Sequence, residues 1–327
     1  MDIHDIILFS EHSEHSDEYS WEDTIGKYEI VFSDHHIESL LQSKGYKSLL
    51  DSKYYKVLLL NDPTCIVSIG GFQAHNEGKH LAELKGLPLV TTPTQLANDS
   101  FGTNRYSITD NEQRASVESV FPVKKVFDIP FLLENGMEKS LWGIGEFIGL
   151  YFSIIDYSLK SSQTFDGLIS WLVEQIHELV SIYNDGNERL ILKKVAILLT
   201  VKCLVMRANG NHEIGCGIDH SFARCFEKNT SIPHGRAVYM GSLLANVLFP
   251  EWEKHGLSKQ LLLNIGKMTG IKKTDIKYMQ SLDILALIRD SIQIRPNRSS
   301  ALESIGSEQY YRIKKAKKEI QELVWED

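Results

Sequence analysis

The organisation of this chain is decided by residues 65–84, which read CIVSIGGFQAHNEGKHLAEL. A β-branched run is followed by the diglycine Gly70–Gly71 and then by a stretch with helical spacing, which predicts a strand, a tight turn and a helix. Glycine lets backbone N–H groups approach an anion closely, and the helix N-terminus adds partial positive charge. The turn is therefore a candidate phosphate cradle, although the same pattern also serves tight packing alone.

Similar short apolar runs flank this segment and extend its pattern. Strand candidates are YEIVF (28–32), KVLLL (56–60), CIVSI (65–69) and LPLVTTP (87–93), whereas HIESLLQSKGYKSLL (36–50) has helical spacing. Continuous apolar strands that alternate with helices indicate a parallel sheet that is buried on both faces.

From residue 138 onward the sequence changes to long helical patterns joined by short Gly, Pro or Asn turns. We therefore expect an α/β domain over 1–130 and an all-helical domain over 131–327. Active sites of such pairs usually lie in the cleft between the domains, and we expect this one to do so.

Composition and net charge argue against nucleic-acid binding, a membrane span and secretion. The net charge of −8 argues against a large nucleic-acid footprint, which needs a basic face. The apolar runs are too short or too interrupted by lysine to predict a membrane span, and the acidic first residues do not resemble a secretory signal. Four cysteines without CxxC spacing fit a reducing compartment, so we expect a cytoplasmic protein.

A polar loop follows the strand candidate at 87–93. Within LPLVTTPTQLANDSFGTNRYSIT (87–109) it carries Asp99, Thr103 and Arg105. Hydroxyls and a carboxylate at the carboxyl end of a strand stand where open α/β sheets bind ligands. An ordinary capped loop would have the same composition, so both interpretations stay open.

Two histidines mark the second half of the chain, in GCGIDHSFARCFEKNTSIPHGRAVYMG (215–241). His220 and His234 stand fourteen residues apart, the second in a Pro-His-Gly turn. Taken alone, this spacing fits either two structural histidines or two of the ligands of a metal site.

Together these segments resemble the superfamily that holds dehydroquinate synthases, iron-containing alcohol dehydrogenases and sn-glycerol-1-phosphate dehydrogenases. Besides the diglycine and the polar loop, the matching segments in chain order are GIGEFIGLYFSIIDYSL (143–159), GIDHSF (217–222), HGRAVYMG (234–241) and IRPNRSSAL (294–302). The last is similar to an Ile-Arg-Pro-x-Arg run typical of the glycerol-1-phosphate branch. The resemblance implies a Rossmann-like nucleotide domain followed by an all-α metal-binding domain.

The resemblance also implies a metal site, because an acid and two histidines hold a divalent cation in that superfamily. The matching positions are Glu146, His220 and His234. Such a ligand set leaves a coordination position open for substrate oxygens, as a catalytic metal requires. It suits zinc, which we expect, and also iron, nickel or manganese. Glutamate at 146 matches the dehydroquinate synthase branch, since the glycerol-1-phosphate branch has aspartate there.

The same resemblance assigns the other site residues. The residues that would line NAD or NADP are Gly70, Gly71, Thr91, Thr94 and Thr103. Asp99 would orient the substrate hydroxyls, and Arg105 or Arg224 would meet the substrate phosphate. Arg224 would alternatively form a salt bridge on its own helix with Glu227 or Asp219.

These assignments predict a homo-oligomeric, metal-dependent dehydrogenase that interconverts a small phosphorylated polyol and its ketone. Two alternatives stay open. One is a sugar-phosphate cyclase or lyase similar to dehydroquinate synthase, which Glu146 favours. The other is a catalytically degenerate homologue that binds a sugar phosphate. It is suggested by Phe72 in place of a third glycine, by Asn76 in place of aspartate and by the short nucleotide domain.

Overall fold

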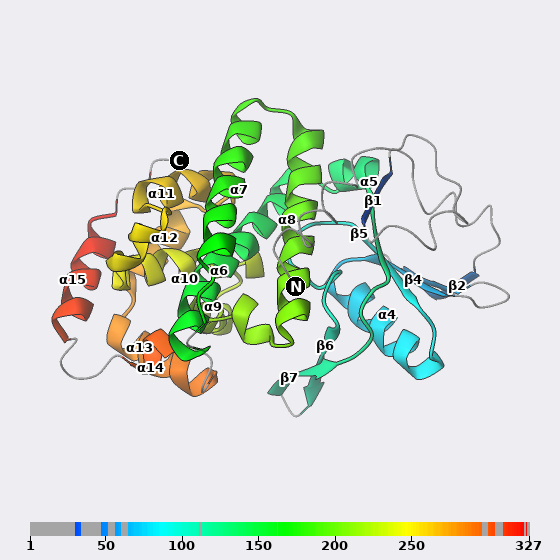
Figure 1. The fold of residues 1–327 in the computed structure, drawn as a ribbon, viewed down its shortest axis with the longest axis horizontal. Helices are drawn as coiled ribbons and strands as arrows, with labels where there is room; N and C mark the ends of the chain where they lie inside the picture. The colour runs from blue at the N-terminus through cyan, green and yellow to red at the C-terminus, as the bar shows by residue number, and fades with distance from the viewer. Residues whose placement is uncertain are drawn as a thin grey trace. The chain divides into compact units, whose positions relative to one another are not determined.

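The computed structural model (Figure 1) describes residues 30–33, 47–51, 56–59, 65–110, 113–161, 163–295, 300–304, 310–323 and 325. The chain forms two compact units, one of 1–140 with 188–207 and one of 141–187 with 208–327. Helix α8 (Glu188–Asn209), which the sequence pattern places in the helical domain, thus lies mostly in the first unit. The domain limits expected from the sequence, 1–130 and 131–327, stay a prediction.

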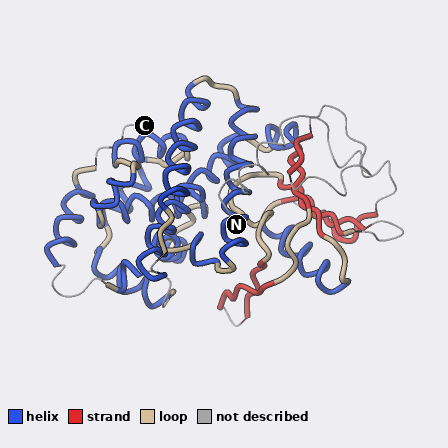
Figure 2. The backbone as a smooth tube through the Cα atoms, viewed as in Figure 1, coloured by secondary structure: helices blue, strands red, loops and turns tan. Residues whose placement is uncertain are grey.

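The first unit is built on a six-stranded sheet, and all described strands belong to this unit (Figure 2). The strand order is β1 (Ile30–Ser33), β8 (Lys124–Asp128), β5 (Leu89–Pro93), β4 (Ile66–Gly70), β3 (Lys56–Leu59) and β2 (Lys47–Asp51). From β1 to β4 the neighbours are parallel, and every residue of β4, β5 and β8 is buried. Burial of both faces explains why consecutive residues of these strands are apolar, as in Ile66–Val67 and Leu89–Val90.

Two features of the sheet correct the expectations from the sequence. The sheet is mixed, because β3 runs antiparallel to both β4 and β2. Residues 47–50, expected to end a helix, lie in strand β2, and the rest of the predicted helix 36–50 falls outside the described residues. Pairing with β3 overrides the local helical spacing there.

Strand β8 had no apolar pattern to reveal it, since it begins with two lysines. Both Lys124 and Lys125 are nevertheless buried. The Lys125 ammonium lies 4.3 Å from the ring centroid of Phe121, a cation–π contact that offsets part of the cost of burying it. A separate hairpin of β6 (Arg105–Asp110) and β7 (Gln113–Glu118) continues the polar loop.

Helix α4 (Phe72–Lys85) follows the diglycine as predicted and packs closely on β4. A Cβ on Gly78 would lie only 2.5 Å from Ser68 Cβ, so the helix can approach the strand because this position has no side chain. The helix ends at Gly86, whose φ of 63° is the left-handed conformation that favours glycine at this position.

The second unit is helical, and no strand occurs among its described residues, as the sequence predicted. Its helices are α6 (Met137–Ser161), α7 (Asp166–Asn184), α9 (Ile218–Asn229), α10 (His234–Leu248), α11 (Lys259–Met268), α12 (Lys273–Ser281), α13 (Ile284–Ile294), α14 (Ser300–Glu303) and α15 (Tyr310–Gln321). Of the helices described in either unit, none combines the length and apolarity that a membrane crossing requires. The predicted fold class, a Rossmann-like α/β unit and an all-α unit, is confirmed.

We predict that Gly78→Ala destabilises the protein by about 1–3 kcal/mol, because the methyl group would overlap Ser68 at the buried face of α4. Urea denaturation measures the effect. Gly167→Ala, in α7 with open space around the position, is the matched control and should be neutral or slightly stabilising. Equal midpoints for the two variants would contradict the close α4–β4 packing.

Buried His75 should make stability depend on pH. Burial and nearby Lys79 lower its pKa from 6.5 to about 3, so the unfolded chain takes up the proton first. Stability present above pH 6.5 is therefore lost as the pH falls toward 3. We expect His75→Asn to flatten this part of the unfolding free energy profile relative to wild type. An unchanged profile in His75→Asn would contradict this account.

Candidate metal centre

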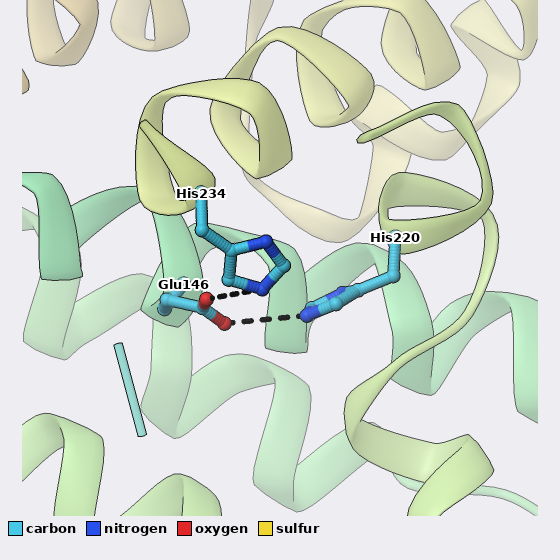
Figure 3. A group of neighbouring side chains, drawn as sticks. All are labelled: Glu146, His220 and His234. Atoms are coloured by element: carbon cyan, nitrogen blue, oxygen red, sulfur yellow. Dashed lines mark ion pairs between the residues drawn. The ribbon is translucent and has the colours of Figure 1, made fainter. Parts of the chain in front are cut away.

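Three predicted ligands converge within the second unit (Figure 3). Glu146 comes from α6, His220 from α9 and His234 from the first position of α10. Glu146 Oε1 lies 2.9 Å from His234 Nε2, and Glu146 Oε2 lies 3.3 Å from His220 Nε2. Residues distant in the sequence therefore present one carboxylate and two imidazole nitrogens to a common point.

Glycines at the helix crossings make this convergence possible. A Cβ on Gly145 would overlap the backbone of Gly235, so α6 and α10 approach at the residues directly beside Glu146 and His234. One turn further along α6, a Cβ on Gly149 would overlap the Asp219 carboxylate. The absence of side chains at these positions lets three helices meet, which is a packing reason for the glycines in 143–149.

Each histidine also contacts a second carboxylate through its other ring nitrogen. His220 Nδ1 lies 2.5 Å from Asp219 Oδ2, and His234 Nδ1 contacts Glu227 Oε1. Asp219 is fully buried and also accepts a 2.6 Å hydrogen bond from the Ser153 hydroxyl. A carboxylate on Nδ1 keeps the proton on that nitrogen, so Nε2 presents its lone pair.

This arrangement fits a cation between the three groups. Both Nε2 atoms face the buried Glu146 carboxylate, whose negative charge favours a cation at this point. Burial acts to lower the pKa of His234, but Glu146 and Glu227 outweigh it and raise that pKa above its ordinary value. One ligand atom from each of the three residues lies within 4.8 Å of the other two, a grouping that could hold one metal ion.

The predicted nucleotide residues lie in the first unit, where Gly70 and Gly71 form the turn between β4 and α4. Gly70 has a φ of 148°, a conformation that L side chains rarely adopt. Its carbonyl accepts a 3.0 Å hydrogen bond from the Thr94 N–H, which joins the carboxyl ends of β4 and β5. Phe72 begins α4 itself, so it occupies the first helical position after the turn.

Two of the residues predicted to line the nucleotide form hydrogen bonds within the first unit. The Thr91 hydroxyl donates a 2.8 Å hydrogen bond to the Phe101 carbonyl. Thr103 Oγ1 accepts from the ammonium of buried Lys79, which also donates to the carbonyls of Ser100 and Arg105. These bonds shape the polar loop, and burial lowers the pKa of Lys79 to about 8. Asn76, where the superfamily has aspartate, bonds to the backbone of Ser107 in the hairpin.

The predicted catalytic residues each have a partner within their own unit. Asp99 lies 3.1 Å from the ammonium of fully buried Lys202 on α8. Arg105 donates to the hydroxyl and the carbonyl of Ser116 across the hairpin, at 2.9 and 2.7 Å. Arg224 donates at 3.0 Å to Glu227, which is the salt bridge on its own helix that the sequence offered as the alternative to a phosphate contact.

Sequence reasoning assigned no role in the metal site to Asp219 or Glu227. Asp219 directly precedes the ligand His220, which is a local signal for a carboxylate on Nδ1. No such signal exists for Glu227, which reaches His234 across the turn between α9 and α10.

The chain is similar in sequence to named dehydrogenases. No protein-family model matches the chain. A glycerol-1-phosphate dehydrogenase [NAD(P)+] of Methanosarcina acetivorans is 21% identical over 252 residues, covering 73% of this chain and 68% of that protein. A protein of the same name from Thermoplasma acidophilum is 24% identical over 251 residues, covering 72% and 68%. The resemblance to this superfamily is confirmed.

Solved structures of low identity share the fold. Glycerol dehydrogenase from Schizosaccharomyces pombe matches with a TM-score of 0.58 and 15% identity over 80% of this chain and 70% of that one. An iron-containing alcohol dehydrogenase matches with a TM-score of 0.54 and 17% identity over 81% and 76%. The chain therefore shares its fold with these two dehydrogenases.

We predict that Gly145→Ala displaces Glu146 from His234, because the new methyl group would overlap the α10 backbone at Gly235. Bound divalent metal, measured by elemental analysis after equilibration, should fall at least about tenfold, in line with losses when metal ligands lose their support. Gly167→Ala is again the control. Full metal content in Gly145→Ala would mean that this helix contact does not set the site.

Proposed function

We propose that this chain is a metal-dependent, NAD(P)-linked dehydrogenase that acts on a small phosphorylated polyol. The observation that carries the proposal is the convergence of Glu146, His220 and His234, with a carboxylate on Nδ1 of each imidazole. Similarity to glycerol-1-phosphate dehydrogenases supports the substrate class and the nucleotide.

In this proposal Glu146, His220 and His234 hold the metal. A bound divalent cation polarises a hydroxyl or carbonyl oxygen of the substrate. Asp219 and Glu227 hold the Nδ1 protons of the two imidazoles, so Nε2 of each ring is the atom that would bind the cation. Burial of Glu146 and His220 restricts water around these ligands.

The first unit supplies the nucleotide and substrate groups in the proposal. Gly70, Gly71 and Thr94 form the turn where β4 and β5 end, and a helix N-terminus there suits a phosphate group. Asp99 orients the substrate hydroxyls and is held by Lys202. Of the arginines proposed for the substrate phosphate, Arg105 of this unit is engaged with Ser116, and Arg224 of the second unit is engaged with Glu227. Their assignment therefore rests on the resemblance.

The proposal also covers the identity of the metal, the oligomeric state, the compartment and the partners. Zinc is the proposed metal, with iron, nickel and manganese as compatible alternatives. A homo-oligomer in the cytoplasm is proposed, and four cysteines without CxxC spacing agree with a reducing compartment. The acidic net charge of −8 supports the absence of a nucleic-acid partner.

We predict that Glu146→Gln lowers bound metal more than about tenfold and abolishes glycerol 1-phosphate oxidation, because the neutral amide cannot balance the cation's charge. Elemental analysis and NAD(P)H absorbance measure the two effects. Glu213→Gln is the control, since Glu213 forms a 2.8 Å ion pair with Lys160 in the same unit. Metal retained by Glu146→Gln would refute the ligand set.

A second candidate function shares the same metal site. Glu146, rather than the aspartate of the glycerol-1-phosphate branch, favours a sugar-phosphate cyclase or lyase similar to dehydroquinate synthase. Fluorescence titration with NADH and NADPH, followed by turnover assays, separates the candidates. Nucleotide binding without net oxidation of any phosphorylated polyol supports the cyclase. Metal binding without nucleotide binding at millimolar concentration supports the degenerate homologue.

A further inference from the structure

The two imidazoles of the metal site are supported differently. Asp219, the partner of His220, is fully buried and is also held by Ser153. Glu227, the partner of His234, has a side chain that is 23% exposed, and His234 itself is 27% exposed. The His234 side of the site therefore has less surrounding structure to keep its ring in place.

The Glu227 carboxylate connects two helices through its two oxygens. Oε1 accepts from Nδ1 of His234 at the start of α10, and Oε2 accepts at 3.0 Å from Arg224, three residues earlier on α9. Glutamate has several rotatable bonds, and a partner on each oxygen removes much of that freedom. The negative charge also suits the N-terminus of α10, where partial positive charge collects.

We infer that Glu227 is a positioning residue for the proposed metal ligand His234, and that Arg224 acts through Glu227. The inference rests on the proposed function, because it requires the metal site. Glu227 keeps the proton on Nδ1 and the Nε2 lone pair directed at the site. Arg224, which the resemblance offered as a phosphate contact, has a different role in this account: it fixes the second oxygen of Glu227.

The direction of the effect follows from the chemistry of the ring. Without an acceptor at Nδ1, the neutral imidazole can place its proton on Nε2 beside Glu146, which is 2.9 Å away. The metal would then have to displace that proton and reorient the ring before His234 binds it. Loss of such supporting groups typically weakens metal affinity 10–100-fold.

The test is a cobalt titration of the metal-free full chain, followed by the visible absorption of bound Co²⁺. We expect Glu227→Ala to weaken the affinity about 10–100-fold, and Glu227→Gln to weaken it less because a neutral oxygen is a weaker acceptor. Arg224→Met should weaken it less than Glu227→Ala and add nothing in the Glu227→Ala background, as two residues in one chain of contacts require. Glu251→Ala is the matched control, since Glu251 pairs with Arg312 at 2.7 Å elsewhere in the unit.

Circular dichroism of the metal-free variants checks that each is folded at the titration temperature, and Glu227→Gln and Arg224→Met serve if Glu227→Ala is not. Unchanged affinity in the Glu227 variants, or an equal loss in Glu251→Ala, would overturn the inference. Additive losses in the double variant would overturn the role of Arg224. Wild-type protein that takes up no cobalt would overturn the metal site as well, which separates failure of the proposed function from failure of the inference alone.

Discussion

The proposed site depends on one close contact, that of α6 with the N-terminal ends of α9 and α10. Gly145 lies against the backbone of Gly235, and Gly149 lies against the carboxylate of Asp219. Because helix axes approach this closely only where side chains are missing, these crossings decide which residues meet. Glu146 lies between the two glycines, and its carboxylate thereby reaches imidazoles from both partner helices.

The same helix contact gathers several carboxylates around the two histidines. A fully buried glutamate is costly unless positive charge or hydrogen-bond donors compensate it. The histidines are themselves held by Asp219 and Glu227 on their far nitrogens, so the cluster carries more carboxylate charge than the imidazoles offset. A divalent cation supplies the missing charge, which gives the metal assignment a physical reason besides kinship. The Arg224–Glu227 pair extends the same network toward the surface.

Sequence patterns predicted the elements whose burial is uniform. Strands β4 and β5 are buried at every residue, so their apolar residues predicted them as strands. The diglycine likewise predicted the turn before α4. Strand β8 was not predicted because it begins with two lysines, a residue type that usually indicates an exposed segment. The long side chains of both lysines are nevertheless buried. Strand β2 was predicted as part of a helix, but its pairing with β3 overrides the helical spacing of its own residues.

By itself the sequence determined the residue types of the candidate metal site and, through resemblance, predicted that Glu146, His220 and His234 belong together. It also determined that a glycine turn precedes a helix at Gly70 and Gly71. Only the tertiary structure decided that the Glu146 carboxylate contacts both histidines, and that Glu227 is the second carboxylate at His234. The reason is that residues on different helices become neighbours through helix crossings, which no local periodicity in the sequence records.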